Sequence, residues 1–155
     1  MVHLSQQDPR WAKEHLGKSK ITVGRYGCTT TCISMLSDYF ECFASPKELA
    51  VSQVIGTELL GYTNDGLIIW QTLNLKHMAF AARLRSRNDF EIEKSLKDPR
   101  KAVILQVNDG AHWVVAIGKV PLLRNVYWVI DPWDGKKKTT RAFRNITGSA
   151  HFNQK

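Results

Sequence analysis

The stretch RYGCTTTCISML, residues 25–36, places a cysteine where a helix is predicted to begin. A helix N-terminus carries free backbone N–H groups and partial positive charge, and both favour the thiolate, which is the reactive form of a cysteine. The same N–H groups can bind an oxyanion. Cys28 is therefore a candidate nucleophile, although a small buried residue that packs a helix is the commoner role for such a cysteine.

A thiolate nucleophile needs a base, and the chain offers five histidines. His112 begins a predicted strand directly after the turn sequence NDG, which is a rigid mount that solvent can reach. His3 and His151 lie near the termini, where order is usually poor. His15 and His77 lie near predicted helix ends, where an imidazole can interact with the helix dipole. His112 is the candidate base, against the alternative of a half-exposed strand histidine.

A carboxylate that could orient this imidazole ends the next predicted strand. Asp131, in WVIDPW, follows His112 by 19 residues, and two antiparallel neighbours with a short connection would bring the two together. A carboxylate among apolar residues needs a partner. The alternative is a turn-forming Asp-Pro pair, a role that Asp134 before Gly135 fits better.

A neutral donor for an oxyanion could come from the segment SQQDPRW near the N-terminus. Gln6 and Gln7 are both candidates, because a side-chain amide can donate to a developing negative charge. A plain surface pair is the alternative interpretation.

The elements that must position these residues change in type along the chain. A capping box of Ser45 and Glu48 marks the clearest helix. Helices are predicted over residues 8–17, 28–40, 45–56, 65–77 and 89–98. Strands are predicted over residues 78–84, 101–107, 112–120, 125–133 and 138–146. Helices first and strands later indicate one α+β domain, residues 1–155, with an antiparallel sheet packed on an N-terminal helical layer.

Composition excludes several classes of protein. No stretch approaches the roughly 18 apolar residues of a membrane span. The polar N-terminus does not resemble a secretory signal, so we expect synthesis in the cytoplasm and, for any action on the cell wall, a signal-independent release. Three cysteines without a Cys-x2-Cys pair favour neither a disulfide framework nor a metal site.

The formal net charge of +8 is concentrated in the basic C-terminal segment, residues 135–155, which holds six Lys and Arg residues and no Asp or Glu. Such a segment attracts polyanions, for example an acidic wall polymer, an anionic lipid or a nucleic acid, and a solvated face is an equally good interpretation. Its aromatic residues are only Phe143 and Phe152, so nucleic acid binding by base stacking is weakly supported.

Four blocks in this order, SQQDPRWAKEHLG, ITVGRYGCTTTCISML, GAHWVVAIG and YWVIDPW, resemble the papain-like cysteine peptidases over about residues 5–134. The branch akin to the bacteriocin double-glycine-leader peptidases is the most similar. The resemblance implies a papain-like fold and no cofactor or metal. It implies that Cys28 is the nucleophile, His112 the general base and acid, and Asp131 the residue that orients the histidine. Gln6 fits the oxyanion position best, with Gln7 left open.

The expected function is therefore a cysteine peptidase that forms an acyl-enzyme, with a peptide or the stem peptide of peptidoglycan as substrate. A phage-type endolysin would combine such a site with a basic surface. Two alternatives stay open: acyltransferase or amidase chemistry at the same site, and a non-catalytic module that binds polyanions.

Overall fold

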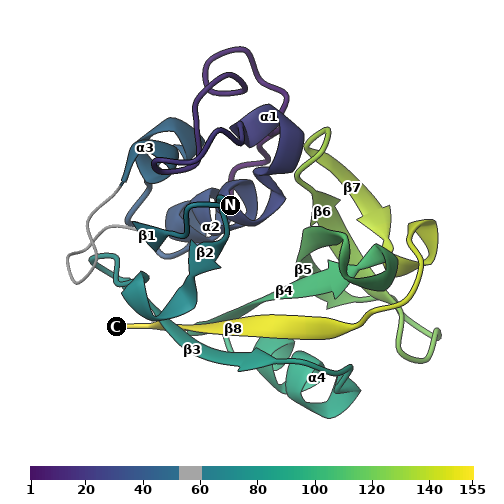
Figure 1. The fold of residues 1–155 in the computed structure, drawn as a ribbon. Helices are drawn as coiled ribbons and strands as arrows, with labels where there is room; N and C mark the ends of the chain where they lie inside the picture. Colours follow the sequence, from purple (N-terminus) through teal and green to yellow (C-terminus); the bar gives the residue numbers. More distant parts are fainter. Residues whose placement is uncertain (53–60) are drawn as a thin grey trace.

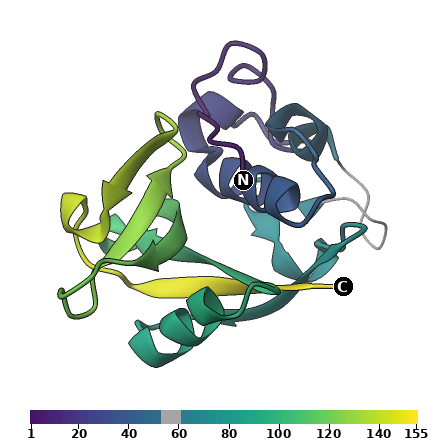
Figure 2. The same cartoon turned by 180° about the vertical axis from the view of Figure 1, so that it is seen from behind.

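The computed structural model describes residues 1–52 and 61–155, and these fold into a helical layer on a curved antiparallel sheet (Figure 1). The helical layer contains α1 (Val23–Tyr26), α2 (Cys28–Tyr39) and α3 (Pro46–Val51). A fourth helix, α4 (Asp89–Lys97), covers the opposite face of the sheet, as the view from behind shows (Figure 2). This arrangement confirms the predicted α+β class. None of the helices in the described residues is long and apolar enough to cross a membrane.

The main sheet has six strands in the order β3-β8-β4-β5-β6-β7, and every neighbouring pair is antiparallel. The strands are β3 (Met78–Leu84), β4 (Lys101–Val107), β5 (His112–Lys119), β6 (Tyr127–Asp131), β7 (Lys136–Thr139) and β8 (Gly148–Gln154). A separate ribbon pairs β1 (Gly61–Tyr62) with β2 (Ile68–Ile69). Short 3₁₀ turns are η1 (Trp70–Thr72), η2 (Asn108–Gly110) and η3 (Thr140–Ala142).

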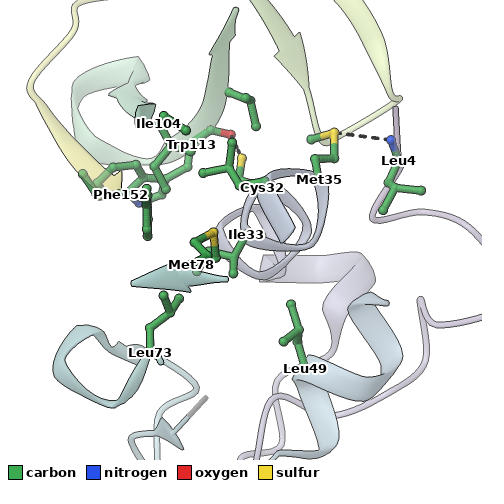
Figure 3. Packing of buried hydrophobic residues seen from close by; sticks show 14 of the residues in the cluster. Leu4, Cys32, Ile33, Met35, Leu49, Leu73, Met78, Ile104, Trp113 and Phe152 are labelled. Atoms are coloured by element: carbon green, nitrogen blue, oxygen red, sulfur yellow. Dashed lines mark hydrogen bonds between the residues drawn. The ribbon is translucent and has the colours of Figure 1, made fainter. Parts of the chain in front are cut away.

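Two apolar clusters hold the layers together. The larger lies between α2 and the sheet, where Ile33 of α2 and Phe152 of β8 are fully buried (Figure 3). The N-terminal segment closes one end of this cluster, with the Leu4 amide 3.4 Å from the Met35 sulfur. The smaller cluster lies under α4, around Ile92. Because α2 and α4 pack on opposite faces, β4 and β5 are apolar on both sides and read as nearly continuous hydrophobic runs.

Several predicted elements are confirmed. The helices α2 and α4 and the strands β3, β4, β5 and β6 occupy the predicted ranges within a few residues. The capping box is also confirmed, because the Ser45 hydroxyl accepts from the Glu48 amide at 3.2 Å and the Glu48 carboxylate accepts from the Ser45 amide at 2.7 Å. Residues 53–56 of that predicted helix lie outside the described residues.

Two predicted helices are wrong, for tertiary reasons. Residues 8–17 form successive turns instead of a helix. The Ala12 carbonyl accepts from the Gly24 amide and the Glu14 carbonyl accepts from the Val23 amide, so these carbonyls bind α1 and not a further helical turn. Residues 65–77 contain β2 and η1, because β2 pairs with β1 and the Trp70 ring packs on the rings of Phe80 and Trp113.

The basic C-terminal segment is built into the sheet. The strand predicted over residues 138–146 is largely wrong: β7 ends at Thr139, and the missed strand β8 lies between β3 and β4. The expectation of poor order at His151 is also wrong, since this residue is buried in β8 with its ring nitrogens 2.8 Å from the hydroxyls of Ser95 and Ser149. Residues 148–154, GSAHFNQ, lack the alternating apolar pattern of a strand, because small residues stand at neighbouring positions and Phe152 is their only large apolar residue.

The position of β8 predicts a large cost for truncating its buried aromatic ring. Phe152 is 0% exposed, so Phe152→Ala should lower the free energy of unfolding by about 3–5 kcal/mol. Phe90→Ala is the matched control, because Phe90 is 73% exposed on α4 and its truncation should cost less than about 0.5 kcal/mol. Urea unfolding of both variants measures the difference, and equal small losses would show that β8 is not part of the core.

Candidate active site

Cys28 is the first residue of α2, and the residue before it must be a glycine. A Cβ at Gly27 would lie 2.5 Å from the carbonyl oxygen of Val23 and 2.6 Å from its Cα, so no larger residue allows α1 to run into α2 this closely. The first helical hydrogen bond of α2 joins the Thr31 amide to the Gly27 carbonyl at 2.9 Å. The amides of the first turn, including that of Cys28, therefore point outward from the start of the helix, beside the thiol.

His112 is the first residue of β5, directly after the tight turn η2. Asn108 and Asp109 have φ values of 53° and 56°, and Gly110 has 94°, so the turn uses the left-handed conformations that Asn, Asp and Gly tolerate. The turn fixes the register in which Val107 of β4 pairs with His112. The imidazole is thus mounted at a rigid strand end, as its place after NDG indicates.

Asp131 ends β6, and the antiparallel pairing of β5 with β6 closes its 19-residue separation from His112. The His112 Nε2 atom lies 2.7 Å from the Asp131 Oδ1 atom. Because Nε2 faces Asp131, the second ring nitrogen, Nδ1, is left for the Cys28 side chain, which also acts to raise the pKa of His112. The structure therefore brings Cys28, His112 and Asp131 together, with the imidazole between the thiol and the carboxylate.

Burial would by itself lower the pKa of His112, but the hydrogen bonds and charge interactions with Asp131 and Cys28 raise it to about 9. At neutral pH the imidazole is consequently protonated. The arrangement can supply both a nucleophile and a proton donor.

Asp131 is buried, and each of its carboxylate oxygens is paired. Oδ1 accepts from His112 and, at 2.9 Å, from the Trp133 amide, whereas Oδ2 accepts from the Lys138 ammonium at 2.6 Å. Burial would raise the pKa of Asp131, but the bonds from His112, Lys138 and Trp133 lower it to about 2. The carboxylate is therefore charged at every pH at which the protein would act.

Lys138 is a site residue that sequence reasoning missed. It lies on β7 and also contacts the Asp134 carboxylate at 3.1 Å, so it bridges the end of β6 and the turn that follows. In the sequence Lys138 is one of three consecutive lysines. The only signal that distinguishes it from the other two is its position four residues after Asp134. Trp133 was also missed as a site residue, and its ring is 51% exposed beside His112 and Asp131.

Gln6 and Gln7 both reach the backbone of α1, but they differ in burial. Gln6 is 2% exposed, its backbone amide donates to Pro132 at 2.7 Å, and its side-chain Nε2 donates to the Gly24 carbonyl at 3.1 Å. Its Oε1 atom is buried without a hydrogen-bond partner among the described residues. Gln7 is exposed on the surface. Gln6 thus lies between the residue after Asp131 and the segment that leads to Cys28.

The candidate site opens to solvent on two sides. A hollow of about 370 Å³ has Cys28, Gly66, Leu67 and Trp113 among its lining residues. A second hollow of about 340 Å³ is bordered by His112, Asp131, Trp133 and Phe143. A chain that crosses from one hollow to the other would pass over both the thiol and the imidazole.

The other two cysteines do not share this environment. Cys32 is fully buried, its thiol donates to the Trp113 carbonyl at 3.6 Å, and burial raises its pKa well above the ordinary value. Cys42 is half-buried and, like the other two, is not in a disulfide. Within residues 1–52 and 61–155, no group of three His, Cys, Asp or Glu side chains could hold a metal ion.

The paired Asp131 predicts a shifted acid titration in a Lys138 variant. Asp131 stabilises the fold above its ordinary pKa of 3.8, and this contribution is lost as the pH falls through about 2. In Lys138→Met the loss of the ammonium should raise the pKa of Asp131 from about 2 toward its ordinary value of 3.8, so the pH range over which stability is lost becomes narrower and the total loss becomes smaller. Carboxyl-carbon NMR titration of Asp131 measures this change.

Lys137→Met is the matched control for that titration, because the Lys137 ammonium lies over the Trp128 ring, 4.4 Å from its centroid, and contacts no carboxylate in the described residues. An Asp131 pKa that moves equally in both variants would contradict a specific Lys138–Asp131 interaction.

Comparison with known proteins places this site in a family. The model of the Peptidase C39 family matches residues 20–145, which include Cys28, His112 and Asp131. No curated protein matches the chain. Because the family model covers well over half of the chain and the fold is the α+β arrangement expected for papain-like peptidases, the chain belongs to the Peptidase C39 family of cysteine peptidases.

Proposed function

We propose that this C39 peptidase hydrolyses peptide bonds through a triad of Cys28, His112 and Asp131. The observation that carries the proposal is the position of His112: its Nε2 atom lies 2.7 Å from Asp131 Oδ1, and the Cys28 side chain as well as Asp131 acts to raise its pKa. Such a chain of nucleophile, base and orienting acid is how a weak nucleophile is activated in covalent catalysis.

In the proposed reaction, the Cys28 thiolate attacks the carbonyl carbon of the scissile bond. The oxyanion is bound by the Cys28 amide and by the Gln6 side chain, whose Nε2 exchanges its bond to the Gly24 carbonyl for one to the oxyanion. His112, held by Asp131, donates its Nδ1 proton to the leaving amine, the carbon–nitrogen bond breaks, and a thioester remains on Cys28. His112 then takes a proton from water, and the resulting hydroxide attacks the thioester and releases the acid and the thiolate.

For the substrate, we propose the peptide cross-links of peptidoglycan, in the manner of a phage-type endolysin. Support comes from charge: the net charge is +8, and Lys136, Lys137, Arg141 and Arg144 are exposed around the candidate site. A positive surface concentrates an enzyme at anionic wall polymers. An acidic wall polymer is accordingly the proposed partner of the basic C-terminal segment.

We expect wild-type protein incubated with purified peptidoglycan to release new amino groups, and Cys28→Ala to release almost none. Cys42→Ala is the control and should retain activity, because its thiol is remote from the His112–Asp131 pair. Release of amines from a denatured proteome but not from peptidoglycan would contradict the wall substrate. Activity that survives in Cys28→Ala would contradict the triad. Products joined to an added amine would indicate acyl transfer.

The oxyanion donor is tested by comparing the two neighbouring glutamines. Gln6→Ala should lower kcat by about 100-fold or more, since a donor to the oxyanion is lost. Gln7→Ala should change kcat by less than a few-fold, because Gln7 is exposed on the surface, whereas Gln6 is buried between Pro132 and the segment that leads to Cys28. Steady-state kinetics of both variants measures these changes in kcat. A larger loss of kcat for Gln7→Ala than for Gln6→Ala would assign the role of oxyanion donor to Gln7.

A further inference from the structure

Four arginines surround a hollow that the triad does not use. This arginine groove, of about 300 Å³, is lined by Arg87, Arg124, Arg141 and Arg144, with Asn125 and Asn145 between them. Its lining residues come from the segment before α4, from the β5–β6 connection and from the segment that runs from η3 toward β8. Residues from three separate parts of the chain therefore converge on one cationic surface.

The charges of the arginine groove are only partly neutralised by the protein. Arg87 is paired with Asp89 at 2.9 Å and donates to the Asn125 carbonyl at 2.9 Å, which holds it in place. Arg144 has a longer contact of 3.5 Å with Asp109. Arg124 and Arg141 have no acidic partner in the described part of the chain. Exposed guanidinium groups without partners are suited to bidentate binding of carboxylates.

The arginine groove is continuous with one side of the active site. Phe143 and Arg144 line both the groove and the hollow that contains His112 and Trp133. That hollow is bordered by His112, whereas the opposite one is bordered by Cys28. Because His112 donates its proton to the leaving amine, the segment of substrate after the scissile bond must lie on the imidazole side. A substrate extended in this direction reaches the arginines.

We infer that the arginine groove is a specificity subsite that binds acidic residues of the substrate on the C-terminal side of the cut bond. The inference rests on the proposed function, since it uses His112 as the donor to the leaving amine. The ligand is an acidic peptide segment: its carboxylates pair with Arg124 and Arg141, while Arg87 and Arg144 add positive potential. Bound acidic residues would align the scissile bond over Cys28.

The first test is binding to inactive protein, which does not depend on catalysis. A fluorescent hexaglutamate peptide is titrated into Cys28→Ala at low ionic strength, and into the same protein with Arg124→Ala and Arg141→Ala. We expect the double change to weaken binding by roughly fivefold or more, and added salt to weaken the parent more than the variant. Lys13→Ala with Lys18→Ala is the matched control, because these changes remove the same amount of positive charge. Both lysines are exposed and form no ion pair within the described residues.

Equal weakening by the arginine and lysine changes would overturn the inference, because it would show an effect of net charge alone. Tighter, groove-dependent binding of a single-stranded oligonucleotide than of hexaglutamate would also overturn it, and would assign the groove to nucleic acid.

The second test reads specificity from cleavage. Wild-type protein digests a denatured proteome, and the new N-termini are identified by mass spectrometry. We expect Asp and Glu to be enriched over Lys and Arg in the first residues after the cuts, and Arg124→Ala with Arg141→Ala to lose this enrichment while the residues before the cuts stay the same. Cuts without acidic enrichment in wild type would contradict the subsite but not the triad. If wild type cuts neither the proteome nor purified peptidoglycan, the proposed function fails. In that case, and if only peptidoglycan is cut, the binding test decides whether the groove takes an acidic peptide.

Discussion

The candidate site depends on one buried carboxylate. Asp131 is 3% exposed, and a buried charge is tolerated only when its attraction to partners offsets the loss of water. Here the imidazolium of His112 occupies one oxygen and the ammonium of Lys138 the other. These partners come from β5 and β7, the two neighbours of β6. The pairing of three strands is thus linked to the charge state of the site, because a shift of either neighbour would leave one carboxylate oxygen without its charged partner.

The thiol comes from the other layer, and apolar packing sets its distance from the imidazole. Cys28 and Cys32 are one helical turn apart on α2, whereas His112 and Trp113 are consecutive on β5. The Cys32 thiol donates to the Trp113 carbonyl. This contact joins α2 to β5 one helical turn from Cys28 and one residue from His112, so it helps to hold the Cys28 thiol beside the imidazole. Ile33, Met35 and Leu36 bury the same helix in the large core cluster. Truncation of any of these would be expected to move the Cys28 thiol as well as to destabilise the fold.

The basic C-terminal segment serves several parts of the molecule at once. Lys138 pairs with the carboxylate of the site, the η3 region provides Arg141 and Arg144 to the arginine groove, and β8 completes the middle of the sheet. Its positive charge is therefore divided between the candidate site, the arginine groove and the surface of the sheet, and is not displayed on a free extension. This arrangement explains how a segment with no acidic residue can nevertheless include a buried strand, because the charged residues precede Gly148 and only Lys155 follows it.

The sequence alone determined the local features. The Gly-Cys pair before a helix, the left-handed NDG turn before His112, and the strand that ends at Asp131 depend on backbone preferences of neighbouring residues, which a pattern of residues expresses directly. The order of the elements, with helices first and strands later, was enough to indicate the α+β class. Tertiary structure alone decided the rest. Residues 8–17 form turns whose carbonyls accept from the backbone of α1, in place of the predicted helix. The segment around Trp70 is not a helix, because the Trp70 ring packs in the aromatic core. Ser149 to Phe152 form an inner strand because they pair with both β3 and β4. The pairing of Lys138 and the convergence of the four arginines depend on strands and loops that are distant in the chain. The neighbouring residues in the sequence therefore do not predict the charge pair or the groove.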